Sequence, residues 1–125
     1  MDIILRNGGD VPIYDQITQQ IKGHILSGTL AEGEALPSMR VLARDLRISV
    51  ITTKRAYEEL EREGFITTVP GKGCFVAARD LELMREDARR RVEEHLAQAV
   101  DIARSAGIPP SEVREALDIL TKEVF

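Results

Sequence analysis

Residues 36–76 read LPSMRVLARDLRISVITTKRAYEELEREGFITTVPGKGCFV, and this stretch decides the fold of the chain. Ser38 and Ser49 are each placed to cap a helix, because a serine oxygen accepts a hydrogen bond from a free N–H group of the first helical turn. Side chains suited to a core recur at helical spacing after both serines. They are Leu42, Ala43 and Leu46 in the first segment and Thr53, Ala56, Tyr57 and Leu60 in the second. Two short helices joined by a tight turn predict a helix-turn-helix.

Two short strands are predicted after the second helix, at residues 66–69 and 74–76. Pro70, Gly71, Lys72 and Gly73 lie between them. Glycine adopts positive φ without a steric penalty, which the tip of a tight hairpin requires. The expected fold is therefore mainly α with a small β wing, an α+β class in which a winged helix-turn-helix is followed by a helical segment.

Length and composition limit the alternatives. The chain has 125 residues, enough for one domain and a small appendage. Its longest apolar run, residues 74–78, is far shorter than the roughly 20 residues that span a bilayer. The start of the chain has neither the basic residues nor the cleavage site of a secretory signal. These features predict a cytoplasmic protein without a membrane partner, in which the single cysteine, Cys74, is a packed structural thiol.

Charge is distributed unevenly along the chain. The net charge of −4 is unusual for a nucleic-acid binder. Residues 37–55, however, contain five basic side chains and one acidic side chain, whereas residues 79–125 contain eight basic and eleven acidic ones. A local basic surface attracts phosphate and an acidic one repels it. The pattern predicts that the helix-turn-helix contacts nucleic acid and that the C-terminal segment does not.

The second helix of the motif is the expected recognition helix. With its apolar stripe buried, Ile51, Lys54 and Arg55 point outward, and the N-terminal turns of such a helix fit the major groove of DNA. Arg40 and the amide of Ser49 are placed for phosphate, and the glycines of the wing allow a close approach to the minor groove. The predicted DNA-binding residues are Arg40, Ser49, Ile51, Thr52, Lys54, Arg55, Gly71, Lys72 and Gly73.

Other functions are disfavoured. A charge cluster is often an ordinary solvated surface, but here the basic residues coincide with the turn, the recognition helix and the wing. A single-strand or RNA platform would need exposed aromatic side chains, and the chain has few aromatic residues. Neither His24 nor His95 has other ligands at metal-binding spacing, and no nucleophile has a placed base. We therefore expect no metal, no cofactor and no enzymatic activity.

The segments before the motif have simpler patterns. Residues 1–10 end in the glycine-rich NGGD and are expected to form a flexible arm. Ile13, Ile17, Ile21 and Ile25 recur every four residues, which predicts a helix that begins near Pro12 and ends at Gly28.

The C-terminal segment, residues 79–125, predicts two helices separated by Gly107, Ile108, Pro109 and Pro110, the second capped by Ser111. Each helix has an apolar stripe, and an antiparallel hairpin of two helices is too small to bury both. The stripe residues expected to mediate dimerisation are Leu81, Met84, Ala88, Val92, Leu96, Ala99, Leu117 and Leu120. The alternative is that this tail packs on the winged domain, residues 1–78.

A family resemblance adds to these predictions. The string SGTLAEGEALPSMRVLARDL, with PIYDQI upstream and EREGFI and GKGCFV downstream, resembles the winged-helix domain of the GntR family of bacterial transcription regulators. The resemblance covers residues 10–78. The short tail is similar to that of the YtrA-like subfamily, in which two helices mediate dimerisation in place of a large ligand-binding domain.

The resemblance implies which residues contact DNA and where this chain differs. Matching positions imply contacts from Arg40, Ser49, Thr52, Lys54 and Gly71. Many relatives have arginine where this chain has Val50, a basic or polar residue where it has Pro70, and glycine in the turn where it has Arg47.

The expected function is therefore sequence-specific DNA binding by a homodimeric transcription repressor that occupies an inverted-repeat operator. Two alternatives remain open at this point. One is a regulator gated by a small-molecule effector bound between the tail and the winged domain. The other is a winged-helix module that binds a protein partner.

Overall fold

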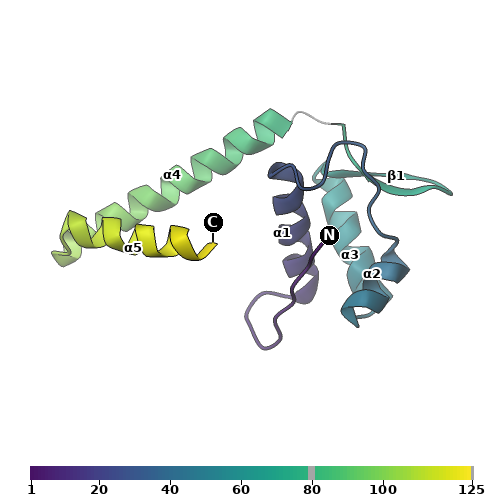
Figure 1. Ribbon diagram of the computed structural model, residues 1–125, viewed down its shortest axis with the longest axis horizontal. Helices are drawn as coiled ribbons and strands as arrows, with labels where there is room; N and C mark the ends of the chain where they lie inside the picture. Colours follow the sequence, from purple (N-terminus) through teal and green to yellow (C-terminus); the bar gives the residue numbers. More distant parts are fainter. Residues whose placement is uncertain (79–80, 125) are drawn as a thin grey trace. The chain divides into compact units, whose positions relative to one another are not determined.

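The computed structural model describes residues 1–78 and 81–124. This part of the chain contains five helices and one two-stranded hairpin (Figure 1). These elements are distributed over two units, Met1–Leu81 and Glu82–Phe125. The predicted class, mainly α with a small β wing, is confirmed. Within the described ranges, no helix combines the length and apolarity that crossing a membrane requires.

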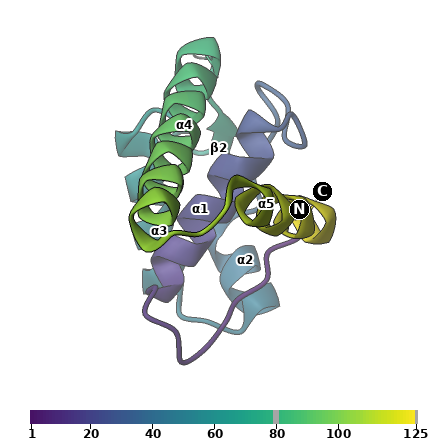
Figure 2. The same cartoon turned by 90° about the vertical axis from the view of Figure 1, so that its left-hand side faces the viewer.

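The first unit consists of α1 (Ile13–Leu26), α2 (Met39–Leu46) and α3 (Val50–Arg62), followed by β1 (Ile66–Val69) and β2 (Gly73–Val76). Both α1 and α2 pack on α3 (Figures 1 and 2). The side chains at the centre of this core are Ile17, Ile21, Ile25, Thr53, Ala56, Tyr57 and Leu60, each at most 1% exposed. Because the core face of α3 is covered by two helices, its opposite face is left to solvent.

The helix-turn-helix begins and turns as the sequence predicts. Ser38 Oγ accepts a hydrogen bond from Val41 N–H at 3.1 Å, and Ser49 Oγ accepts one from Thr52 N–H at 3.1 Å. Between the two helices, Arg47 has φ 56° and ψ 48°, the left-handed conformation that ends many helices. The following amide, Ile48 N–H, donates to the Ala43 carbonyl at 3.0 Å. The chain therefore turns within the three residues between the helices and leads directly into α3.

Arg47→Gly is expected to raise the free energy of unfolding by about 1 kcal/mol, because glycine removes the clash between Cβ and the carbonyl oxygen at positive φ. Urea denaturation measures the change. The matched control is Arg47→Ala, which removes the same charge and keeps the Cβ atom. Equal stabilities of the alanine and glycine variants would show that the left-handed turn is not strained.

Two buried polar side chains fix the orientation of α3 relative to α2. Thr53 Oγ1 lies 2.8 Å from the Val50 carbonyl of its own helix and 3.1 Å from the carbonyl of Met39, the first residue of α2, so its one hydroxyl proton is shared between them. Tyr57 Oη donates to the Pro37 carbonyl at 2.7 Å, just before that helix. Burial raises the pKa of Tyr57, so the phenol remains a neutral donor at all ordinary pH values. Losing the Tyr57 donor would remove the hydrogen bond of the Pro37 carbonyl, which lies outside the helix and has no intrahelical partner.

The wing is larger than the sequence predicts. β1 and β2 are antiparallel, with Ile66 opposite Val76 and Val69 opposite Gly73, so β2 begins one residue earlier than expected. A third segment joins the sheet through the bridge between Ala35 and Phe75. Two bonds flank this bridge: Leu36 N–H to the Cys74 carbonyl and Val76 N–H to the Glu34 carbonyl, each at 2.9 Å. Cys74 is buried in β2, as expected of a structural thiol.

The N-terminal arm differs from its prediction. The sequence predicts a flexible segment, but the arm runs along α1 and is bound to two glutamine side chains. Ile4 N–H donates to Gln20 Oε1 at 2.8 Å, and Gln20 Nε2 donates back to the Ile4 carbonyl at 2.7 Å. Gln16 makes the same pair of bonds with the N–H and carbonyl of Arg6, at 2.8 and 2.9 Å.

The second unit contains α4 (Leu81–Ala106) and α5 (Pro110–Val124). Gly107 has φ 74° and ends α4, and Ile108 N–H donates to the Ala103 carbonyl at 2.8 Å. Pro110 is the first residue of α5, a position that suits proline. Ser111 therefore lies within the first turn and is not the N-terminal cap that the sequence predicts. The sequence predicts an antiparallel hairpin here, but the two helices diverge from their turn and do not pack along their length (Figure 2).

Candidate nucleic-acid interface

The outer face of α3 has one strongly exposed apolar residue among polar ones. Ile51 is 80% exposed and lies in the first turn, next to Thr52, which is half-buried. Lys54 and Arg55 are exposed one turn further along. An isoleucine this exposed does not stabilise the isolated fold, and apolar contact with a thymine methyl is one of the ways in which a recognition helix distinguishes bases. The predicted outward direction of these residues agrees with the structure.

The N-terminus of α3 presents free amide groups. Ser49 Oγ accepts a hydrogen bond from the N–H of Thr52 and lies 2.9 Å from Thr52 Oγ1. These two contacts hold the Ser49 side chain in one rotamer. The amides of Val50 and Ile51, in the first turn, have no partner within the helix. Such amides lie at the positive end of the helix dipole and form a suitable site for a phosphate oxygen. Ser49 is the N-terminal cap of α3, next to these amides, and its contact with a phosphate stays a prediction.

The two basic side chains in the N-terminal half of α3 differ in how firmly their neighbours hold them. Lys54 Nζ lies 3.8 Å from Glu58 Oε1, and both side chains are 64% exposed. A surface pair of this kind contributes little free energy, so Lys54 is available for another partner. Arg55, in contrast, stacks on the ring of Tyr14, with the guanidinium carbon 3.8 Å from the ring centroid. The sequence pattern predicts a free outward side chain at Arg55 and does not reveal this contact with α1.

Stacking alters what Arg55 can do. The ring of Tyr14 covers one face of the guanidinium, whereas the N–H donors lie in the plane of the group and are not used by this contact. The contact fixes the side chain between α1 and α3, so it loses less conformational entropy if it binds a phosphate. The sequence contains one sign of this contact. Tyr14 follows Ile13, so its ring lies beside the apolar stripe of α1, within reach of a side chain from a helix packed on that stripe.

Arg40 and the wing tip complete the predicted surface. Arg40 is exposed in the first turn of α2, and it forms no ion pair within the described residues. At the tip, Lys72 N–H donates to the Val69 carbonyl at 2.9 Å, and Gly71 has φ 76° in a Pro-Gly turn. Gly71, Lys72 and Gly73 are all exposed, and open space surrounds both glycines. The tip can therefore approach another molecule closely through its backbone.

Acidic side chains gather at the opposite end of α3, where several are paired within the unit. Glu59 accepts a hydrogen bond from Arg62, which holds the pKa of that carboxyl below its usual value. Glu63 lies 2.7 Å from Lys22 of α1, in a partly buried pair. The charge of the helix is thus positive near its N-terminal turns and negative near its C-terminus, which suits a helix that enters a groove by its N-terminus.

No metal site accompanies these charges in the part of the chain that the structure describes. There, His, Cys, Asp and Glu side chains nowhere gather in groups of three that could hold an ion.

The second unit leaves much apolar surface uncovered. Among the predicted dimerisation residues, Val92 is 57% exposed, Leu96 43%, Leu117 42% and Leu120 59%. Ala99 is also exposed, whereas Met84 and Ala88 are half-buried. The side chain of Leu81 lies outside the described residues. α4 and α5 therefore present apolar side chains that the unit itself does not cover.

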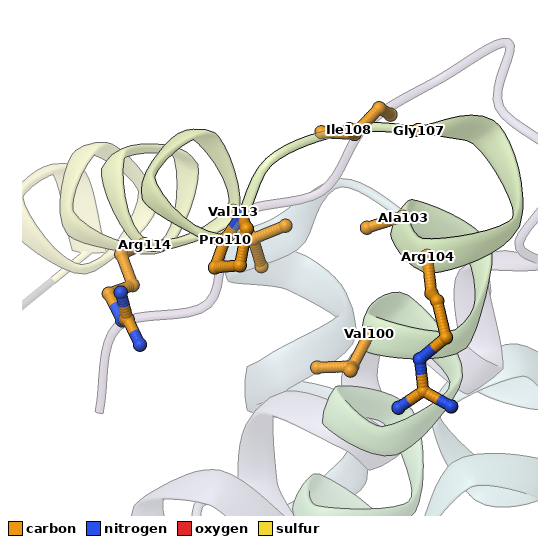
Figure 3. A pocket seen from close by; sticks show the side chains of 8 residues that line it. All are labelled: Val100, Ala103, Arg104, Gly107, Ile108, Pro110, Val113 and Arg114. Atoms are coloured by element: carbon orange, nitrogen blue, oxygen red, sulfur yellow. The ribbon is translucent and has the colours of Figure 1, made fainter.

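A cavity of about 560 Å³ lies at the turn between α4 and α5 (Figure 3). Val100, Ala103, Ile108 and Val113 supply apolar walls, and Ala103 is 7% exposed. Arg104 and Arg114 flank the cavity. The divergence of the two helices thus leaves an open hollow on the tail, which no sequence pattern predicts.

Comparison with known proteins identifies the winged unit. Residues 13–76 match the family model described as bacterial regulatory proteins, gntR family. The chain belongs to the GntR family. It is 34% identical to the HTH-type transcriptional repressor YtrA of Bacillus subtilis strain 168 over 113 residues, 90% of this chain and 87% of that protein. A match of this extent continues beyond residue 76 into the tail, which confirms the resemblance to YtrA-like proteins.

Solved structures agree with the assignment. A GntR family transcriptional regulator from Listeria monocytogenes is 29% identical, with a TM-score of 0.70 over 97% of this chain and 100% of that one. The AraR DNA-binding domain in complex with operator ORE1 is 26% identical, with a TM-score of 0.53 over 62% of this chain and 94% of that one. The protein is a DNA-binding transcription regulator and not an enzyme, so a winged-helix module for a protein partner is not retained.

Proposed function

We propose that this GntR regulator is a homodimeric, cytoplasmic repressor that occupies an inverted-repeat operator. The observation that carries the proposal is the division of exposed surface between the two units. The winged unit exposes a positively charged edge with free amides, and the tail exposes an apolar stripe. The first surface suits DNA, and the second suits another copy of the chain.

On the DNA side, each predicted residue has a distinct role. Ile51, Thr52 and Lys54 enter the major groove and distinguish bases, since they lie on the outer face of the N-terminal turns of α3. Arg40, Arg55 and the amides after Ser49 bind phosphates and set the position of the helix. Gly71, Lys72 and Gly73 follow the minor groove next to the recognition helix.

On the tail, the case for a dimer is energetic. α4 has 26 residues and is about 39 Å long at a rise of 1.5 Å per residue. Val92, Leu96 and Val100 on this helix remain exposed in the single chain. Burial of apolar surface contributes about 25 cal/mol per Å², so a second copy that covers this stripe is strongly favoured. Most homodimers are two-fold symmetric, and a two-fold dimer presents two recognition helices to related half-sites.

Repression follows from the place on the DNA at which the dimer binds. A dimer bound at an operator that overlaps a promoter excludes polymerase by occupancy. The relative YtrA is itself named a transcriptional repressor.

Selection from a random pool of DNA fragments tests the proposal. We expect the bound fragments to share an inverted repeat, because two symmetry-related helices recognise the same bases in opposite orientations. Enrichment of a single half-site without a partner would contradict the dimer. Recovery of unenriched fragments would contradict base recognition by α3. Sequencing of the pool before selection provides the control.

A further inference from the structure

The N-terminal arm is bound to α1 as a strand is bound to a neighbouring strand. Alternate residues of the arm bond to every fourth residue of the helix: Asp2 to His24, Ile4 to Gln20 and Arg6 to Gln16. The spacings match, because four helical residues rise about 6.0 Å and two extended residues about 6.6 Å. Each glutamine amide accepts one backbone N–H of the arm and donates to one backbone carbonyl, as a neighbouring strand would. The arm is extended and runs antiparallel to α1.

An extended arm held on one side has a second edge. Successive residues of a strand direct their N–H and C=O groups to opposite sides, so those of Ile3 and Leu5 face away from α1. Within the described chain, these groups make no hydrogen bond. The side chain of Ile4, between them, is 73% exposed. The arm therefore has the properties of an open edge strand, which readily pairs with another strand.

We propose that this edge pairs with the same arm of a second copy, antiparallel and two-fold symmetric about Ile4. In this register Ile3 of one chain lies opposite Leu5 of the other, and their outward amides exchange hydrogen bonds. The two Ile4 side chains face each other at a non-hydrogen-bonded position. Asp2 of each chain lies opposite Arg6 of the other, so both outer pairs join opposite charges.

The sequence DIILR selects this register over its neighbours. A shift of one residue would place an outward-facing amide opposite one already bound to glutamine, so the ladder could not form. A shift of two residues would place Asp2 opposite Ile4 and leave both arginines without a partner. The centred register joins apolar with apolar and acid with base at every position. A second copy of the arm is therefore the partner that best matches its edge, its exposed isoleucine and its charges.

Arm pairing is a self-contact separate from the one proposed for α4 and α5. By itself it is too short to hold a stable dimer, because two paired strands alone are at best marginally stable, so it is detected by covalent trapping. It joins two chains through backbone hydrogen bonds of the winged unit.

Disulfide cross-linking of the full-length protein tests the register. Ile4→Cys in a Cys74→Ala background is expected to form covalent dimers under mild oxidation. Facing residues at a non-hydrogen-bonded position have Cα atoms about 4.5 Å apart, within the range that a disulfide spans. Leu5→Cys in the same background is the matched control. Its two copies are offset by two residues, which places their Cα atoms beyond the roughly 7 Å limit for bridging.

Charge reversal tests the outer pairs in the Ile4→Cys protein. Asp2→Arg and Arg6→Asp should each slow cross-linking at least about threefold, because each sets like charges opposite one another at two places. Combining both substitutions restores opposite pairs and should restore the rate. Cross-linking of Leu5→Cys as fast as Ile4→Cys would overturn the proposal. Absence of a covalent dimer, or failure of the combined variant to recover, would also overturn it.

Discussion

Leu96→Asp is expected to convert the protein from dimer to monomer and to lower its operator affinity by a factor of roughly 10² or more. Leu96 is 43% exposed near the middle of the α4 stripe. In a dimer seam, the substitution would bury an unpaired carboxylate in each subunit, at a large cost in free energy. Without the seam, the second winged unit no longer binds at the millimolar effective concentration that the first one provides. Light scattering measures the mass, and fluorescence anisotropy with operator DNA measures affinity.

The matched control is Gln98→Asp, which makes the same change of charge about 200° around α4 from Leu96. It should leave both mass and affinity unchanged. A Leu96→Asp protein that remains dimeric would place the interface elsewhere. A monomer that binds the operator as tightly as the parent protein would show that the two half-sites are bound independently.

Arg40→Glu should weaken binding to all DNA sequences alike, by about 10² at physiological salt, because it removes one phosphate interaction per subunit and adds repulsion at the same place. The logarithmic slope of affinity against salt should fall in magnitude by about 0.9 for each phosphate that is no longer neutralised, or about 1.8 for the dimer. Titrations at several salt concentrations give both quantities. Affinity that is insensitive to salt in the parent protein would contradict this electrostatic account.

Two comparisons sharpen this test. Arg89→Glu makes the same charge change on the tail and should leave the salt slope unchanged. Lys54→Ala, in contrast, should change which base is preferred at one position of each half-site, since Lys54 lies on the recognition face of α3. An Arg40→Glu protein with unchanged affinity would mean that the proposed orientation of α2 on DNA is wrong.

Local patterns explain why the helix-turn-helix could be predicted from sequence. Ser38 and Ser49 cap their helices through hydrogen bonds within three residues, and the stripe from Thr53 to Leu60 repeats at helical spacing. The left-handed turn at Arg47 agrees with the family resemblance, which implies that many relatives have glycine at this position. Each of these features depends on neighbours along the chain, so the pattern of residues contains the necessary information.

The features that sequence patterns do not reveal depend on interactions between distant residues. The third segment of the wing is joined through Ala35 and Phe75, and a single bridge leaves no periodic signal. Gln20 has no apolar or capping pattern that marks it, yet it binds the backbone of Ile4 sixteen residues earlier. The stacking of Arg55 on Tyr14 joins two helices whose relative positions no local pattern specifies. Tertiary packing, and not local preference, determines all three.

Footprinting of an operator with altered spacing tests the central claim most directly, namely that a two-fold dimer binds both half-sites at once. Inserting about 5 base pairs, half a helical turn, between the half-sites turns the second groove away from its recognition helix. We predict that the gain from the second half-site is abolished, whereas an insertion of about 10 base pairs keeps the grooves on the same face. Undiminished protection of both halves in the 5-base-pair variant would contradict the claim, because each subunit would then bind alone.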